Sequence, residues 1–143
     1  MMKILFVCKY NLFRSRIAEA YFNKLNGDKQ IKTTSAGLTR VNKRLPKKDT
    51  SYLIAKKFGF NLNGKPRKIN NQLLKKQDII VVVANDVSKS FFKNKKVNNK
   101  IVFWDIPDET KKDKKNIINI IRKIKNKVTK FYTSLQNGKK RTN

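Results

Sequence analysis

The sequence has 143 residues, of which 38% are hydrophobic, and this length and composition fit one domain with an ordinary core. A single cysteine excludes an intramolecular disulfide, and no apolar run reaches the roughly 18 residues that would predict a membrane span. We therefore expect a cytoplasmic protein that does not enter membranes.

The net charge of +27, from 36 basic and nine acidic residues, has two interpretations. One is an anionic partner such as nucleic acid. The other is compositional drift, which we favour because lysines are scattered over the whole chain and asparagine and isoleucine are also abundant. Under either interpretation the charge attracts anionic substrates.

The chain alternates between short apolar runs and amphipathic segments. The run Ile-Leu-Phe-Val within 3–8 and the run at 79–83 are unbroken, which predicts strands that are buried on both faces. Asp49 or Thr50 is placed to cap a helix. In chain order we expect a strand at 3–8, a helix at 14–26, a strand at 31–35, helices at 50–59 and 70–76, a strand at 79–83, a helix at 85–93, a strand at 101–104 and a helix at 112–135.

This alternation predicts an α/β fold in which helices cover both faces of a parallel sheet. Ligands of such sheets bind at the carboxyl ends of the strands. We expect one domain over residues 1–135, followed by a polar tail at 136–143 that is disordered.

The only cysteine stands where the first strand ends, in the segment VCKYNLFRS at 7–15. The loop from Cys8 to Arg14 leads into a helix, whose N-terminus offers unpaired N–H groups and the positive end of a dipole. Such a loop binds a phosphate-like dianion, and the Arg14 guanidinium adds two parallel hydrogen bonds. The same field favours the thiolate of Cys8, with Ser15 donating its hydroxyl to the sulfur. The alternative is a buried cysteine that only packs in the core.

VCKYNLFRS, followed by Ala18-Glu19, resembles the signature loop of the low-molecular-weight protein-tyrosine phosphatases. Three further segments resemble motifs of that family in the same order: SAG at 35–37, DIIV at 78–81 and WDIPD at 104–108. The resemblance covers residues 3 to about 135. It implies a single-domain three-layer sandwich of the flavodoxin-like phosphatase type, with a four-stranded parallel sheet flanked by helices. It also implies a phosphomonoester phosphatase that uses no metal or other cofactor.

The resemblance assigns roles to individual residues. Cys8 attacks phosphorus and forms a thiophosphate intermediate, while Arg14 and the loop amides hold the phosphate oxygens. Asp108 protonates the leaving oxygen, and Asp105 is the runner-up for this role. The expected phosphate-binding residues are Lys9, Tyr10, Asn11, Leu12, Phe13, Arg14 and Ser15, and the expected support of the loop comes from Asn11, Ser15 and Ser35.

The sequence departs from the family pattern at several positions. Tyr10 stands where many members have glycine, so a positive φ there would be strained. Phe13 replaces a second cysteine that many members carry, and Glu109 replaces a proline. The expected partner is a phosphorylated protein or a small phosphomonoester, so phosphotyrosine, phosphoarginine, a metabolite and a nucleotide all stay open.

Two other functions also stay open. One is a non-catalytic module that binds phosphate or nucleic acid. The other is an arsenate reductase, which would depend on an external thiol because the chain has no second cysteine. The sequence does not predict the oligomeric state.

Overall fold

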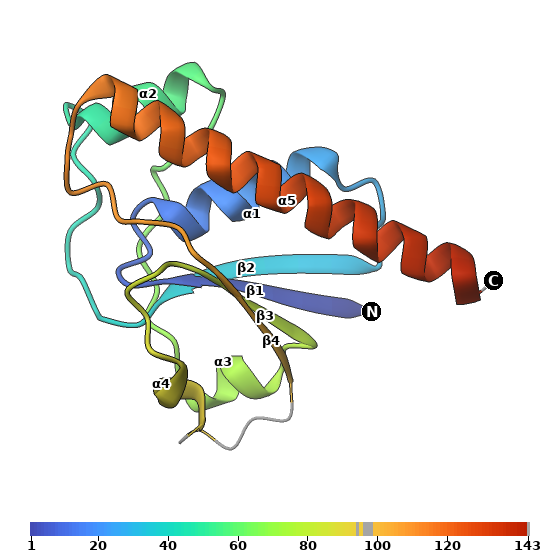
Figure 1. Cartoon of the computed structure of the whole chain (residues 1–143). Coiled ribbons are helices and arrows are strands. Elements are labelled where there is room, and N and C mark those ends of the chain that lie inside the picture. The colour runs from blue at the N-terminus through green and yellow to red at the C-terminus, as the bar shows by residue number, and fades with distance from the viewer. Residues whose placement is uncertain (94, 96–98, 143) are drawn as a thin grey trace.

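A computed structural model describes residues 1–93, 95 and 99–142, with side chains up to residue 138. In this part of the chain four parallel strands form one sheet in the order β2-β1-β3-β4 (Figure 1). The strands are β1 (Met2–Cys8), β2 (Ile31–Gly37), β3 (Ile79–Val83) and β4 (Lys100–Trp104). The helices are α1 (Arg14–Leu25), α2 (Thr50–Lys57), α3 (Asn71–Lys75), α4 (Lys89–Lys93) and α5 (Lys114–Thr142). The predicted α/β fold with a four-stranded parallel sheet is confirmed.

Helices cover both faces of the sheet, with α1, α2 and α5 on one side and α3 and α4 on the other (Figure 1). Side chains of β1 alternate between the two layers: Ile4 and Phe6 join the core under α1 and α5, whereas Leu5 and Val7 join the core under α3 and α4. All four side chains are buried. This burial on both faces explains why the strand reads as an unbroken apolar run.

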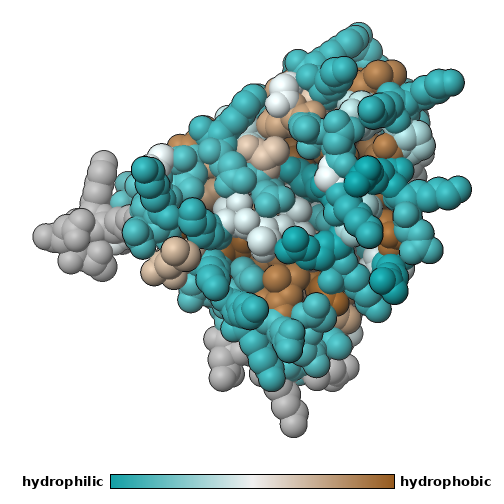
Figure 2. Space-filling view, turned by 180° about the vertical axis from the view of Figure 1, so that it is seen from behind, coloured by the Kyte–Doolittle hydropathy of each residue, from teal (hydrophilic) through white to brown (hydrophobic). Residues whose placement is uncertain are grey.

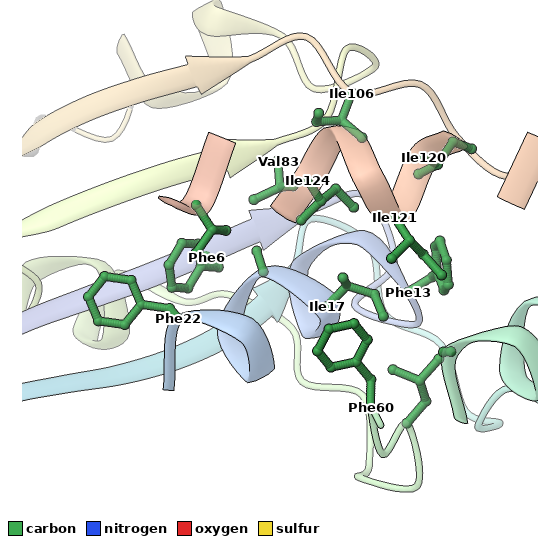
Figure 3. Close-up of a cluster of buried hydrophobic side chains, with 14 of the residues drawn as sticks. Phe6, Phe13, Ile17, Phe22, Phe60, Val83, Ile106, Ile120, Ile121 and Ile124 are labelled. Atoms are coloured by element: carbon green, nitrogen blue, oxygen red, sulfur yellow. The ribbon is translucent and has the colours of Figure 1, made fainter. Parts of the chain in front are cut away.

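The larger core lies between the sheet and the helices α1 and α5. Ile17 and Phe22 of α1 point toward the apolar side of α5 (Figure 3). The ring of Phe22 also packs against that of Phe6 in β1, with 5.9 Å between the ring centroids. The apolar side of α5 is buried, and it consists of Ile117, Ile120, Ile121, Ile124 and Val128.

Two helices differ from the sequence-based expectation. Helix α5 runs from Lys114 to Thr142, beyond the predicted end at 135. This segment contains no proline, and adding residues to an existing helix costs little. Helix α4 begins at Lys89 rather than 85, because the Asn85 N–H donates to the Ile106 carbonyl (2.9 Å) and holds the preceding residues in a loop.

The strand order changes direction between β1 and β3, since β2 and β4 lie on opposite sides of this pair. Such a switch opens a crevice at the carboxyl ends of the strands, where ligands bind in α/β folds. The loops that follow β1, β3 and β4 all leave the sheet at this edge (Figure 1). No helix among the described residues is long and apolar enough to cross a membrane.

Candidate active site

The loop between β1 and α1 begins at Cys8, the last residue of its strand, whose side chain is buried. The first hydrogen bond of the helix runs from the Ile17 N–H to the Phe13 carbonyl, so the N–H groups just before Ile17 lie ahead of the helical ladder. Phe13 is the N-cap residue, and its side chain makes no cap hydrogen bond. The N-terminus of α1 is therefore open to an anion.

The Cys8 sulfur lies within reach of two hydrogen-bonding groups. The Asn11 N–H donates to Sγ at 3.3 Å, and the Ser15 Oγ lies 3.0 Å from Sγ. The Cys8 thiol donates to Ser15 Oγ, which also accepts a hydrogen bond from Asn11 Nδ2 (2.8 Å). When the sulfur has lost its proton, the Asn11 N–H and the Ser15 hydroxyl are the two neighbouring groups that can donate to it.

Asn11 connects the loop to its surroundings. Its Nδ2 donates to Ser35 Oγ (3.0 Å), its Oδ1 accepts from the Arg67 N–H (3.0 Å), and its carbonyl accepts from Arg16 Nε (2.6 Å). Its φ is 58°, and among the described residues it is the non-glycine residue with positive φ. The strain considered for Tyr10 is therefore absent, and the left-handed conformation falls on asparagine, which adopts it more readily than tyrosine.

Arg14 is almost fully buried, at 2% exposure, and contacts the two loops that follow β3 and β4. Its Nη1 donates to the Ile106 carbonyl (3.0 Å), and its Nη2 lies 3.0 Å from Asp86 Oδ1. Asp108 Oδ1 is 3.9 Å from the same Nη2, whereas Asp105 is exposed. The structure therefore places Asp108, of the two candidate acids, beside the arginine.

Asp86 is the site residue that sequence reasoning missed. It lies in a loop without a recognisable motif, three residues after the end of β3. The only available signal is its position, because β3 neighbours β1 in the sheet and parallel neighbours end at the same edge. Its carboxylate orients the Arg14 guanidinium and neutralises part of its charge.

Glu109 adds a buried carboxyl next to Asp108. Its side chain is 11% exposed, and its N–H donates to Asp108 Oδ1 at 2.8 Å. Burial, followed by the negative charge of Asp108, raises the pKa of Glu109 to about 7, although Lys112 at 3.9 Å opposes this shift. A carboxyl next to Asp108 thus changes its protonation near neutral pH.

The remaining loop residues divide into a rim and a base. Lys9, Tyr10 and Leu12 are half-buried at the rim, where the Lys9 ammonium lies 5.4 Å from the centre of the Tyr10 ring. Phe13 points into the core between the sheet and α5, so only its backbone faces the loop. Ser35 supports the base, because it accepts from Asn11 and donates to Glu19 Oε1 at 2.8 Å.

The chain is similar in sequence and fold to known proteins. The sequence profile of the family described as low molecular weight phosphotyrosine protein phosphatase matches residues 3–141. A solved arsenate reductase from Archaeoglobus fulgidus is 26% identical, with a TM-score of 0.71 over 91% of this chain and 98% of that chain. A protein tyrosine phosphatase from Entamoeba histolytica, in a product state mimic, is 20% identical, with a TM-score of 0.80 over 96% of this chain and 97% of that chain. YfkJ from Bacillus subtilis is 24% identical, with a TM-score of 0.76 over 97% of each chain. No curated protein matches the sequence.

Proposed function

Because the chain belongs to the low-molecular-weight phosphotyrosine protein phosphatase family and is a cysteine-based phosphatase, we propose that it removes phosphate from phosphotyrosyl proteins at the loop from Cys8 to Ser15. One observation carries this proposal. The Cys8 sulfur lies at the open N-terminus of α1, within hydrogen-bonding distance of the Asn11 N–H and the Ser15 hydroxyl, and the buried Arg14 begins the same helix. These groups suit a nucleophile beside a bound dianion.

In the first step the Cys8 thiolate attacks phosphorus. A sulfur–phosphorus bond forms, the bond between phosphorus and the tyrosyl oxygen breaks, and the leaving oxygen takes the proton of Asp108. Arg14 and the loop N–H groups hold the three other phosphate oxygens. The product of this step is a thiophosphate on Cys8.

In the second step the Asp108 carboxylate takes a proton from water, and the water oxygen attacks phosphorus. The sulfur–phosphorus bond breaks, inorganic phosphate leaves, and Cys8 returns to the thiolate. The Ser15 hydroxyl, 3.0 Å from Sγ, can donate its proton to the sulfur as the thiolate leaves.

Asp86 has a positioning role in this scheme. Arginine carries five N–H donors, and the contacts to Ile106 and Asp86 engage Nη1 and Nη2 on the side facing the loops after β3 and β4. The remaining donors are available to the phosphate. Asp86 thereby fixes the plane of the Arg14 guanidinium before substrate arrives.

Steady-state hydrolysis of p-nitrophenyl phosphate and of a phosphotyrosyl peptide tests the assigned roles. Cys8→Ser is expected to abolish turnover. Asp108→Asn is expected to lower kcat for the peptide by about 100-fold, since general acid catalysis contributes on this scale. Asp105→Asn is the matched control and is expected to stay within about twofold of the unaltered chain, because its side chain is exposed. Equal phosphate release by the unaltered chain and by Cys8→Ser would show the proposal to be wrong.

The substrate class needs a separate assay. We expect the highest kcat/KM for phosphotyrosyl peptides in a panel that also contains phosphoarginyl peptides, sugar phosphates and nucleotides. A higher value for another class would replace the phosphotyrosyl assignment and leave the roles of Cys8, Arg14 and Asp108 in place.

The similarity to an arsenate reductase supplies a second candidate function. Arsenate reduction needs two electrons, and the chain offers one cysteine, so an added thiol must provide the second sulfur and end as part of a disulfide. Arsenite formation that requires both Cys8 and added glutathione would support this activity. If no arsenite formed under these conditions, the arsenate reductase activity would be rejected.

A further inference from the structure

A groove of about 540 Å³ lies between the loop that follows β2 and the segment that precedes α3. Its lining includes the cationic side chains of Arg40, Lys65 and Lys68 and the apolar side chains of Val41, Pro66 and Ile69. We call this feature the basic groove. The three cations are exposed, whereas Ile69 is buried and the other two apolar residues are half-buried.

The basic groove lies beside the phosphate loop. The Leu38 N–H donates to the Cys8 carbonyl (3.0 Å), and the Ile69 N–H donates to the Gly37 carbonyl (2.9 Å), so both walls are anchored at the end of β2. Gly37 itself packs on the phosphate loop, because a Cβ at this position would lie 2.6 Å from the Tyr10 carbonyl carbon. A peptide bound with its phosphate over Cys8 therefore has the groove next to it.

The charges of the groove favour carboxylates. None of the described residues that line it is acidic, whereas a smaller pocket, lined by Asn11 among others, contains Glu19 together with its basic residues. Three exposed cations around an apolar floor suit a peptide, with carboxylates at the rim and aliphatic groups below. No described residue of the lining is aromatic, so this part of the groove lacks the stacking surface that single-stranded nucleic acids use.

We propose that the basic groove binds acidic residues that flank the phosphotyrosine of a protein substrate. The proposal rests on the proposed function, since it places the phosphotyrosine over Cys8. It gives Arg40, Lys65 and Lys68 a role in substrate selection, separate from the chemical step. The chain then prefers phosphotyrosines in acidic sequence surroundings.

The test measures binding separately from turnover. Two fluorescent phosphotyrosyl peptides, one with Asp and Glu beside the phosphotyrosine and one with Ser and Gln, are titrated with full-length Cys8→Ser protein by fluorescence anisotropy. The groove variant adds Arg40→Gln, Lys65→Gln and Lys68→Gln. The matched control adds Lys29→Gln, Lys32→Gln and Lys100→Gln, which lie at the amino ends of β2 and β4 and remove the same charge. Circular dichroism checks folding, and Lys68→Gln alone replaces the groove variant if the triple change unfolds the chain.

We expect the acidic peptide to bind about tenfold more tightly than the neutral peptide, because several exposed ion pairs add up to this scale. The ratio should fall to about twofold or less in the groove variant, persist in the control variant, and shrink at about 0.5 M NaCl, where screening is strong. The proposal would be overturned if this ratio fell equally in the groove and control variants, or if the two peptides bound the chain with equal affinity. Groove-dependent binding of a single-stranded oligonucleotide that is tighter than that of the acidic peptide would overturn it as well. Turnover of the neutral peptide by the unaltered chain is measured in parallel, and its absence would reject the proposed function independently.

Discussion

At the scale of single residues, Asn11 supports the phosphate loop with both its side chain and its backbone. Its amide group bonds Ser15, Ser35 and the Arg67 N–H, and its φ of 58° turns the loop so that its own N–H meets the Cys8 sulfur. The supporting bonds and the backbone conformation thus depend on one side chain.

Asn11→Ala is expected to lower kcat for p-nitrophenyl phosphate at least tenfold and the free energy of unfolding by about 2–4 kcal/mol. The variant loses several buried hydrogen bonds and places alanine in a left-handed conformation. Asn11→Gly relieves the backbone strain but not the lost bonds, so its stability should be intermediate and its activity equally low. Urea unfolding and steady-state kinetics measure both effects. Full activity of Asn11→Gly would show that only the backbone conformation matters.

The raised pKa of Glu109 predicts how stability depends on pH. Between its ordinary value of 4.5 and about 7, the folded chain keeps a proton that the unfolded chain has lost. The free energy of unfolding therefore falls as pH rises through this window, and the loss is complete above it. The free energy of unfolding lost in this way is on the order of 2–3 kcal/mol. Solvent screens it little, since the Glu109 side chain is only 11% exposed.

Glu109→Gln removes this loss. Urea unfolding should show the variant to be more stable than the unaltered chain at about pH 8 and similar to it at about pH 4.5. Asp105→Asn is the control, and it should keep the pH dependence of the unaltered chain, because Asp105 is exposed. If the free energy of unfolding of Glu109→Gln changed with pH as it does in the unaltered chain, Glu109 would be ionised across the whole window.

At the scale of secondary-structure elements, the end of β2 determines where the phosphate loop can lie. A Cβ on Gly37 would come within 2.6 Å of the Tyr10 carbonyl carbon and 2.8 Å of the Asn11 nitrogen. Both are backbone atoms of the loop, so they cannot give way by a rotamer change. The contact between β2 and the loop therefore requires glycine at this position.

Gly37→Ala is expected to push the loop away from β2, lowering kcat/KM at least tenfold and the free energy of unfolding by about 1–3 kcal/mol. Gly27→Ala is the matched control, because a Cβ there meets nothing within 4 Å, and we expect its activity to equal that of the unaltered chain. Kinetics and thermal unfolding of the two variants compare the effects directly. Similar activities in both variants would contradict the close contact.

Local sequence predicts some elements of the site better than others. The strand ending at Cys8 and the helix beginning at Arg14 are predictable, because burial on both faces and helical periodicity leave clear patterns. The meeting of Arg14 with Asp86 is not predictable in this way. It depends on β1 and β3 being neighbours, and strand order is a property of the whole sheet. The left-handed turn at Asn11 also depends on tertiary hydrogen bonds, so a family pattern alone points to the wrong neighbour, Tyr10.

At the scale of the whole molecule, the few acidic residues are unevenly distributed. Asp86, Asp108 and Glu109 are three of only nine acidic residues in the chain, and they lie together at the carboxyl edge of the sheet near Arg14. The face shown in Figure 2 is dominated by hydrophilic side chains, with hydrophobic residues confined to small patches between them. Hydrophilic side chains thus dominate this face, while a third of the acidic residues lie together near Arg14, and two of them, Asp86 and Asp108, have roles in the proposed mechanism.

This charge distribution predicts that salt stabilises the folded chain. A net charge of +27 repels itself in the compact state, and NaCl screens that repulsion. Between about 0.02 M and about 0.5 M NaCl we expect the Tm to rise on the order of 5 °C. The Lys29→Gln, Lys32→Gln and Lys100→Gln variant carries three fewer positive charges, so at low salt its Tm should exceed that of the unaltered chain and rise less with NaCl. Calorimetry at matched pH measures both quantities. A Tm that falls with NaCl would mean that local ion pairs such as Arg14–Asp86 outweigh the overall repulsion.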